Sequence, residues 1–303
     1  MRFYGLDLNL LVVLDALLAE QNITRAGEKL FLSQPATSAA LARLRDYFSD
    51  ELLIPVGRRM VRTPVGDSLA QPVRDLLIQM RATLQNQGRF IPKEAERTFT
   101  FMVSDYVSMV LMSEFSQRLS QVAPLCRIEQ FLPSEHAEQQ IERGQVDFLL
   151  LPEQHITDSH PSQPLFQDRY VCLLDQSHPL DAMDFETYRQ LDHVLVRLGD
   201  DHRAPMLDDW LFKRFDFERR VAVTTHTFSS IPAFLVGTQR VATVHQRMAA
   251  LWVNYLPLKI LPLPWESPTL TITLQWNRYQ QQDPGLAWAR QLLIDTASSL
   301  ASS

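Results

Sequence analysis

The first 60 residues carry apolar positions at the spacing of short amphipathic helices. The i, i+3, i+4, i+7 pattern predicts a first helix over about 7 to 20, on Leu10, Val13, Leu14, Leu17 and Leu18. Asn22 is a candidate N-cap for a second, shorter helix that ends near Phe31. Two short helices in succession are typical of a helix-turn-helix.

A third helix is expected from Ser33 to about Tyr47. The Ser33 hydroxyl can cap its first turn, and Pro35 lies where a missing N–H costs nothing. The predicted inward face comprises Thr37, Ala40, Leu41, Leu44 and Phe48. Residues 51–56 and 60–62, joined by the turn 57–59, then predict a short two-stranded wing with basic residues at its tip.

A longer helix is expected to begin at Thr63-Pro64 and to end near 86–88. Its apolar residues recur every three or four positions, close to the period of a helix that pairs with another helix. The alternative is that this stripe packs on the core of its own domain. Pro72 predicts a kink. The stripe comprises Val65, Leu69, Val73, Leu76, Met80 and Leu84.

Beyond residue 97 the pattern changes to short β-type runs that alternate with helical stretches. This alternation predicts an α/β domain with mainly parallel sheets, in which ligand crevices lie at the C-terminal ends of strands. The predicted strands are 98–103, 127–131, 146–151, 170–174, 194–197, 220–225, 241–244 and 270–276.

Charge is distributed unevenly along the chain. The net charge is −6, but residues 1–65 carry +1 and the remainder −7, which permits DNA binding near the N-terminus without indicating it. Cys126 and Cys172 lie in apolar runs, as expected for thiols in a reducing compartment. With no signal-peptide pattern and no apolar run of membrane-spanning length, we expect a cytoplasmic protein without membrane contact.

The whole chain resembles the LysR-type transcriptional regulators. The resemblance is carried by residues 22–45, above all by Ser33-Gln34-Pro35-Ala36-Thr37-Ser38, and by Arg62-Thr63-Pro64-Val65-Gly66. Asp7-Leu8-Asn9-Leu10-Leu11 and the run at 69–73 are similar to the branch of nodulation and aromatic-catabolism regulators. Gly27 stands where the family usually has alanine, and Ile54-Pro55 replaces a wing segment that commonly carries arginine.

The resemblance implies a fold of three parts. An all-α winged helix-turn-helix domain (1–63) leads into a linker and dimerisation helix (64–88). An α/β effector domain (89–303) follows, with two lobes like those of periplasmic binding proteins. The first lobe is expected at about 90–166 with 270–303, and the second at about 167–269, so that the chain crosses between lobes twice.

The third helix is the expected recognition helix, because its first turn would enter the major groove. Gln34 and Ser38 share a face, Gln34 can pair with adenine, and Pro35 can touch a thymine methyl group. Phosphate contacts are expected from Ser33, Arg25, Arg43, Arg58, Arg59 and Arg62. Taken singly, each of these residues could equally be a cap or an ordinary surface residue.

A small-molecule effector is expected between the lobes. Ser104, Asp105 and Tyr106 follow the first predicted strand, where a helix N-terminus offers N–H groups to a carboxylate or phenolate. Residues facing them from the second lobe are expected to be His202, His226, Phe228 and Ser229. Asp168 stands where some aromatic-responsive relatives carry histidine, which argues against a simple salicylate-type anion. Each histidine could instead be a surface or core residue.

The resemblance implies double-stranded promoter DNA, a second copy of the chain in a dimer or tetramer, and RNA polymerase as partners. Enzyme activity is not expected, because the chain contains no G-x-G-x-x-G, G-x-x-x-x-G-K-[ST], H-E-x-x-H or G-x-S-x-G motif. His155, Asp158 and His160 lie in a predicted loop without thiolates, so neither a metal nor a cofactor is expected. The alternative function is a small-molecule-binding protein of solute-binding fold without specific DNA activity.

Overall fold

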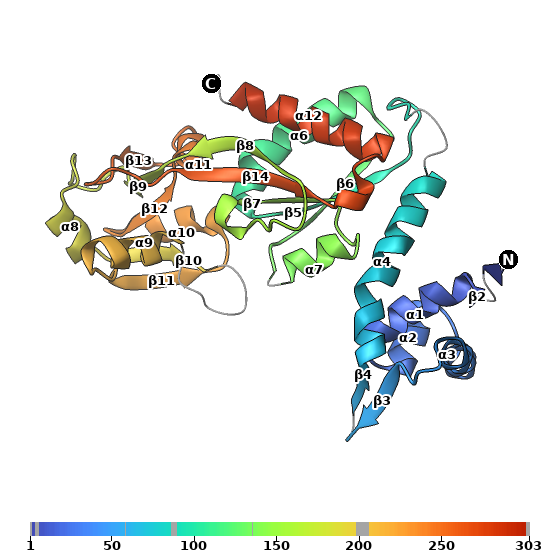
Figure 1. The fold of residues 1–303 in the computed structure, drawn as a ribbon. Helices are drawn as coiled ribbons and strands as arrows, with labels where there is room; N and C mark the ends of the chain where they lie inside the picture. Colours follow the sequence, from blue (N-terminus) through green and yellow to red (C-terminus); the bar gives the residue numbers. More distant parts are fainter. Residues whose placement is uncertain are drawn as a thin grey trace. The chain divides into compact units, whose positions relative to one another are not determined.

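The structure is a computed structural model that describes residues 2–3, 6–57, 59–85, 90–134, 136–197 and 206–300. The chain divides into two compact units, Met1–Gly88 and Arg89–Ser303 (Figure 1). No helix among these residues is long and apolar enough to cross a membrane.

The N-terminal unit is built on three helices: α1 (Asn9–Glu20), α2 (Ile23–Lys29) and α3 (Gln34–Phe48). They follow the short antiparallel strands β1 (Arg2–Phe3) and β2 (Leu6–Asp7). Asn22 caps α2 by accepting a hydrogen bond from the Arg25 N–H at 3.0 Å. Ser33 caps α3 by accepting one from the Ala36 N–H at 3.4 Å. Both predicted caps are therefore confirmed.

One apolar core holds these helices together. Leu14 and Leu17 of α1 are fully buried. On α3, four of the five predicted inward residues are buried, and Phe48 is half-buried. Burial of the α3 stripe against α1 leaves the opposite face of α3 in solvent. The four are Thr37, Ala40, Leu41 and Leu44.

The wing consists of strands β3 (Leu53–Val56) and β4 (Arg59–Arg62), paired antiparallel as predicted. Arg45, near the end of α3, donates hydrogen bonds to the carbonyl oxygens of Glu51 and Leu53, both at 2.8 Å. The guanidinium therefore fixes the start of the wing relative to the third helix.

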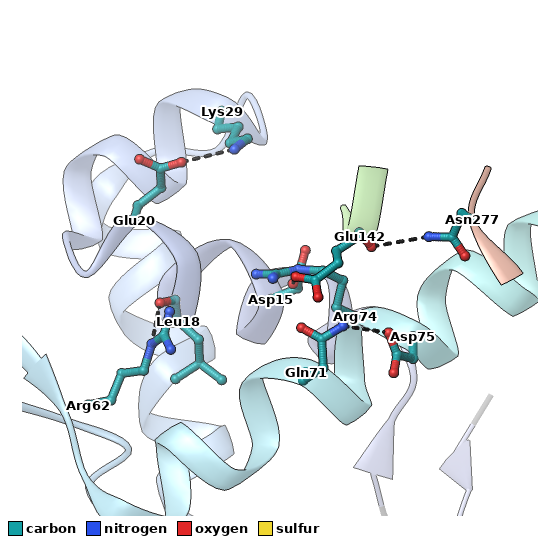
Figure 2. A network of polar contacts seen from close by, with 10 residues as sticks. All are labelled: Asp15, Leu18, Glu20, Lys29, Arg62, Gln71, Arg74, Asp75, Glu142 and Asn277. Atoms are coloured by element: carbon teal, nitrogen blue, oxygen red, sulfur yellow. Dashed lines mark hydrogen bonds and ion pairs between the residues drawn. The ribbon is translucent and has the colours of Figure 1, made fainter. Parts of the chain in front are cut away.

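Helix α4 (Pro64–Gln85) begins inside the core of the N-terminal unit. Arg74 Nε lies 3.2 Å from Asp15 Oδ1 on α1, and Arg62 Nε donates to the Leu18 carbonyl oxygen at 2.7 Å (Figure 2). Val73 lies in the core and joins Ala70 and Leu77, which the predicted stripe did not include.

The apolar stripe of α4 thus divides between two faces: one part packs on the core of its own domain, which was the alternative interpretation, and another part is exposed. Val73 faces its own domain. Val65, Leu76 and Leu84 keep 38%, 44% and 69% of their surface exposed, so they remain available to another helix.

The C-terminal unit contains two sheets of five strands each. The first has the order β6-β5-β7-β14-β8: Arg127–Phe131, Thr98–Val103, Phe148–Pro152, Leu270–Trp276 and Ser162–Asp168. The second has the order β11-β10-β12-β9-β13: Val221–Thr225, His193–Val196, Val241–His245, Tyr170–Asp175 and Leu258–Leu261.

The expectation of mainly parallel sheets was wrong, because each sheet is mixed. Strand β5 pairs parallel with β6 and β7, but β14 pairs antiparallel with β7 and β8. In the second sheet β10 pairs parallel with β11 and β12, but β9 pairs antiparallel with β12 and β13. The antiparallel pairs arise because β9 and β14 enter their sheets from the other sheet rather than through a local helical crossover.

The sequence missed strands β8 and β13. Both are edge strands, and β8 contains Pro164, which an edge strand tolerates because one side of its backbone needs no partner. Only Arg169 separates β8 from β9, so the chain passes from one sheet to the other within a single residue. It returns between β13 and β14, through residues 262–269.

Helices cover both sheets (Figure 1). Those of the first sheet are α5 (Asp105–Val107), the π-helix η1 (Ser108–Met112), α6 (Ser113–Val122), α7 (Ala137–Glu142) and α12 (Pro284–Leu300). Those of the second are α8 (Phe185–Gln190), α9 (Met206–Phe215), α10 (Ile231–Leu235) and α11 (Gln246–Trp252). The remaining turns are η2 (Glu153–His155), η3 (Phe228–Ser230) and η4 (Arg278–Gln280). Asn277 fixes the end of α7 by donating to the Ile141 carbonyl oxygen and to that of Glu142, the second of which is drawn in Figure 2.

Candidate functional site

The first candidate site is the N-terminal end of α3. Gln34, Pro35 and Ser38 are all exposed, as recognition of base edges requires. Thr37 lies on the opposite face and donates from Oγ1 to the Ser33 carbonyl oxygen at 3.1 Å. One face of the first turn is therefore fixed to the core while the other presents short polar and apolar groups.

The predicted phosphate-binding arginines have different surroundings. Arg59, at the wing, is exposed. Arg25 is exposed and donates to the Glu20 carbonyl oxygen at 2.9 Å. Arg43 keeps 53% of its side chain exposed beside Asp7. A backbone hydrogen bond from Asn9 and the Arg43 guanidinium lower the pKa of Asp7.

Arg62 is less exposed than Arg43 and makes two contacts within the fold. It donates to Leu18, pairs with Asp67 at 3.1 Å and has only 23% of its side chain exposed. Its guanidinium holds the second wing strand against α1 and the start of α4. Arg58 lies outside the described residues.

The second candidate site lies where the two sheets of the C-terminal unit meet. Ser104 follows β5 directly and caps α5, accepting a hydrogen bond from the Val107 N–H at 3.4 Å. Asp105 Oδ2 accepts a hydrogen bond from the Ser229 N–H at 2.7 Å, across from the first sheet to the second. Asp105 Oδ1 is buried and has no hydrogen-bond partner. A carboxylate with one unsatisfied oxygen thus lies at the junction.

Tyr106 is buried at this junction and donates from its hydroxyl to Asp168 Oδ2 at 2.6 Å. Asp168 also accepts from the Arg169 N–H at 2.7 Å. Burial raises the pKa of both groups, and the Asp168 carboxylate raises the pKa of Tyr106 further. The sequence placed both residues at the site but did not predict that they would bond each other.

Sequence reasoning missed His245, which lies at the C-terminal end of β12. Its ring stacks on Tyr106, with centroids 3.8 Å apart and planes 19° from parallel, and the Phe228 ring lies 4.8 Å away. Burial lowers the pKa of His245 to about 3, and Nδ1 has no hydrogen-bond partner. Its place at a strand end, the same signal that selected Ser104, could have found it.

The structure brings five of the predicted effector residues together: Asp105, Tyr106, Asp168, Phe228 and Ser229. Ser104 adjoins them in sequence. His226 is exposed after β11, and His202 lies outside the described residues. Within the described part of the chain, no cluster of three or more histidine, cysteine or acidic side chains could hold a metal ion.

These features agree with comparisons to known proteins. Residues 8–67 match the family described as "Bacterial regulatory helix-turn-helix protein, lysR family", and residues 92–298 match "LysR substrate binding domain".

The chain is 39% identical to Nodulation protein D of Bradyrhizobium sp. (strain ANU 289), covering 100% of this chain and 90% of that protein. A probable transcriptional regulator from Pseudomonas aeruginosa has a similar structure, with a TM-score of 0.65 and 28% identity over 96% of this chain and 97% of that one. Full-length CbnR complexed with its target DNA shares the fold, with a TM-score of 0.51 and 14% identity over 96% of this chain and 100% of that chain.

The family models match both parts of the chain, over residues 8–67 and 92–298. A relative that aligns with the whole chain is 39% identical to it. The chain belongs to the LysR family of bacterial transcriptional regulators, with a DNA-binding helix-turn-helix domain and an effector-binding domain.

Proposed function

We propose that this regulator reads promoter DNA with the exposed first turn of α3. The observation that carries this proposal is the separation of faces on that turn. Gln34 and Ser38 point away from a core that holds Thr37. Gln34 would pair with a base edge, Pro35 would contact an apolar base edge, and the Ser33 end of the helix would approach a phosphate.

Electrostatic contacts would come from arginines around this turn. Arg25, Arg43 and Arg59 keep solvent-facing positions and can neutralise phosphates, and Arg58 is proposed beside them. Arg62 would act chiefly by positioning the wing, because its hydrogen bonds are already made within the fold.

Fluorescence anisotropy with a duplex selected by the wild-type chain from a random-sequence library tests this reading. Gln34→Ala should lose about tenfold or more in affinity and relax sequence preference at one position. Gln117→Ala, an exposed glutamine on α6, is the matched control. Unchanged affinity and preference in Gln34→Ala would remove Gln34 from the readout.

The effector is proposed to bind at the junction of the two sheets, beside Ser104, Asp105, Tyr106, Asp168, Phe228 and Ser229. Within this junction Asp105 already occupies the Ser229 N–H that an anion would need. The carboxylates of Asp105 and Asp168 therefore favour a neutral ligand with hydrogen-bond donors over a carboxylate, and the Phe228 ring favours an aromatic one. His226 and His202 are proposed to line the outer part of the same site.

A thermal-shift comparison of neutral phenols with benzoates tests this preference. The wild-type chain should be stabilised by phenols rather than by benzoates. Asp105→Asn should reduce the difference between stabilisation by phenols and stabilisation by benzoates, because it removes a negative charge while keeping the shape of the side chain. A wild-type chain that prefers benzoates would contradict the proposed selectivity.

Effector binding is proposed to shift the population between two conformations that differ in the relative position of the two sheets. The size of this shift is limited by the difference between the ligand's affinities for the two conformations. Dimers would form through α4 and assemble into tetramers. RNA polymerase is proposed as a further partner at the promoter, and the cytoplasm as the location of the protein. Light scattering at micromolar concentration tests the assembly, and a monomer would contradict it.

A further inference from the structure

The turn between α2 and α3 has the hydrogen bonds of a Schellman motif. The Leu32 N–H donates to the Gly27 carbonyl oxygen at 2.9 Å, and the Phe31 N–H donates to that of Glu28 at 3.1 Å. These bonds place Phe31 at the position after the helix C-cap, which has to adopt a left-handed backbone. Its φ is +55°.

Phenylalanine is an unfavourable residue at this position. Helices usually place glycine or asparagine there, because a Cβ in the left-handed region crowds the neighbouring carbonyl oxygen. Packing of the ring could offset that strain, but Phe31 as a residue is 98% exposed, the highest value among the large hydrophobic residues that the structure describes. Backbone strain at a residue without packing indicates a role outside the folding of the chain.

The position of Phe31 indicates where that role lies. It stands two residues before Ser33, the N-cap of α3, and its neighbour Leu32 is also 40% exposed. Gln34 and Pro35 follow, exposed, in the first turn of the helix. The ring therefore belongs to the same surface as the DNA-reading turn.

We infer that Phe31 makes an apolar contact with operator DNA at the edge of the groove that α3 enters. The chemistry that fits is an apolar edge of the duplex, either deoxyribose carbons or a thymine methyl group. The inference rests on the proposed entry of the first turn of α3 into the major groove. It adds an aromatic contact to a surface on which Pro35 is the other residue proposed to make an apolar contact.

Anisotropy with the library-selected duplex and thermal unfolding of the full chain test the inference together. Phe31→Gly removes the ring and the strain, so the melting temperature should rise by several degrees while affinity for the duplex falls about tenfold. Phe31→Tyr keeps the ring and should retain wild-type affinity. Ser49→Gly is the matched control, because Ser49 has a φ of +49° at the opposite end of α3. It should gain stability and bind DNA like the wild type.

Salt dependence separates an apolar contact from a charged one. Phe31→Gly should bind more weakly at every salt concentration with an unchanged slope of log affinity against log salt. Arg59→Gln should lower that slope by about one. A duplex with deoxyuridine in place of thymidine separates the two apolar sources. If Phe31 contacts a methyl group, the substitution weakens binding by the wild type more than binding by Phe31→Gly. If Phe31 contacts sugar, the substitution weakens both chains by the same factor.

If Phe31→Gly binds the duplex with wild-type affinity while Gln34→Ala binds more weakly, the inference about Phe31 is overturned. The proposal that the first turn of α3 reads DNA would then still stand. Loss of affinity in Phe31→Tyr equal to that in Phe31→Gly would also overturn it. A change in molecular mass of Phe31→Gly by light scattering would assign the ring to a second copy of the chain instead.

Discussion

Gly27 of α2 and Thr37 of α3 are in such close contact that a methyl group at position 27 would lie 2.7 Å from Thr37 Oγ1. The glycine that departs from the family's usual alanine is thus matched to the threonine opposite it. The two residues set how closely α2 approaches the recognition helix.

This contact predicts an unequal effect of Gly27→Ala in two backgrounds. Alanine gains up to about 1 kcal/mol in helix propensity, but the clash should make the single variant less stable by about 1 kcal/mol. In a Thr37→Ala background the same change should cost about 1 kcal/mol less, because Thr37 Oγ1 is gone and only the Leu32 carbonyl oxygen, at 3.0 Å, still crowds the new methyl group. Urea unfolding of the four chains measures the coupling, and additive effects would contradict the contact.

The exposed part of the α4 stripe predicts where the chain dimerises. Leu76→Glu places a charge on the stripe at a residue 44% exposed, so it should weaken dimerisation without unfolding the N-terminal unit. Analytical ultracentrifugation measures the dissociation constant, which should rise at least about tenfold. Leu132→Glu, at a residue 61% exposed outside α4, is the control and should leave it unchanged. Equal effects of the two variants would place the dimer contact elsewhere.

The hydrogen bond from Tyr106 to Asp168 predicts a stability effect of Tyr106→Phe. Removing the hydroxyl leaves a buried carboxylate oxygen short of a donor, which should cost about 1 to 3 kcal/mol. The pKa of Asp168 should rise further, since the bond from Tyr106 lowers it. Chemical denaturation at neutral pH measures the loss, and Tyr255→Phe, at a residue 86% exposed, should show none.

His245 predicts a pH dependence of folding. Its pKa falls from an ordinary value near 6.5 to about 3 in the folded chain, so only the unfolded chain binds its proton between those values. The free energy of unfolding should therefore fall as pH drops from 6.5 toward 4, by up to about 1.4 kcal/mol per pH unit for this group. His193, with a pKa lowered to about 4, acts in the same direction. Asp147 and Asp168 act in the opposite direction, because their pKa values are raised and the folded chain therefore binds their protons before the unfolded chain does as pH falls.

His245→Phe isolates this contribution, because it keeps a ring against Tyr106 and removes the titrating group. Between pH 6.5 and 4 its free energy of unfolding should change less steeply with pH than that of the wild type. The difference in slope should correspond to about one proton fewer taken up on unfolding. His226→Phe, at an exposed position, serves as the control. An unchanged slope in His245→Phe would show that another group dominates.

Local patterns were enough to predict the three helices and the wing of the N-terminal unit, but not the short strands β1 and β2. Its two caps depend on side chains within three residues of the amides they bind, so Asn22 and Ser33 could be identified from neighbours alone. The α4 stripe was harder, because a single helical period cannot distinguish Val73, which faces the core, from Leu76, which faces solvent.

The junction site was only partly predictable, because its contacts join distant residues. Asp105 and Ser229 are 124 positions apart, and Tyr106 and Asp168 are 62 apart, so no local rule pairs them. The antiparallel direction of β9 and β14 likewise has no local signal, because it depends on the preceding strand lying in the other sheet. His245 was missed because its neighbours in sequence form an ordinary buried strand.

The single residue between β8 and β9 restricts how the two sheets can move. Any rotation of one relative to the other has to be absorbed by the backbone torsions of residues 168–170 and by the return segment 262–269. The carboxylate of Asp168, which binds the Arg169 N–H and Tyr106, therefore lies on the pivot itself. At a pivot, a displacement of a fraction of an ångström becomes a much larger one at the far edges of the sheets.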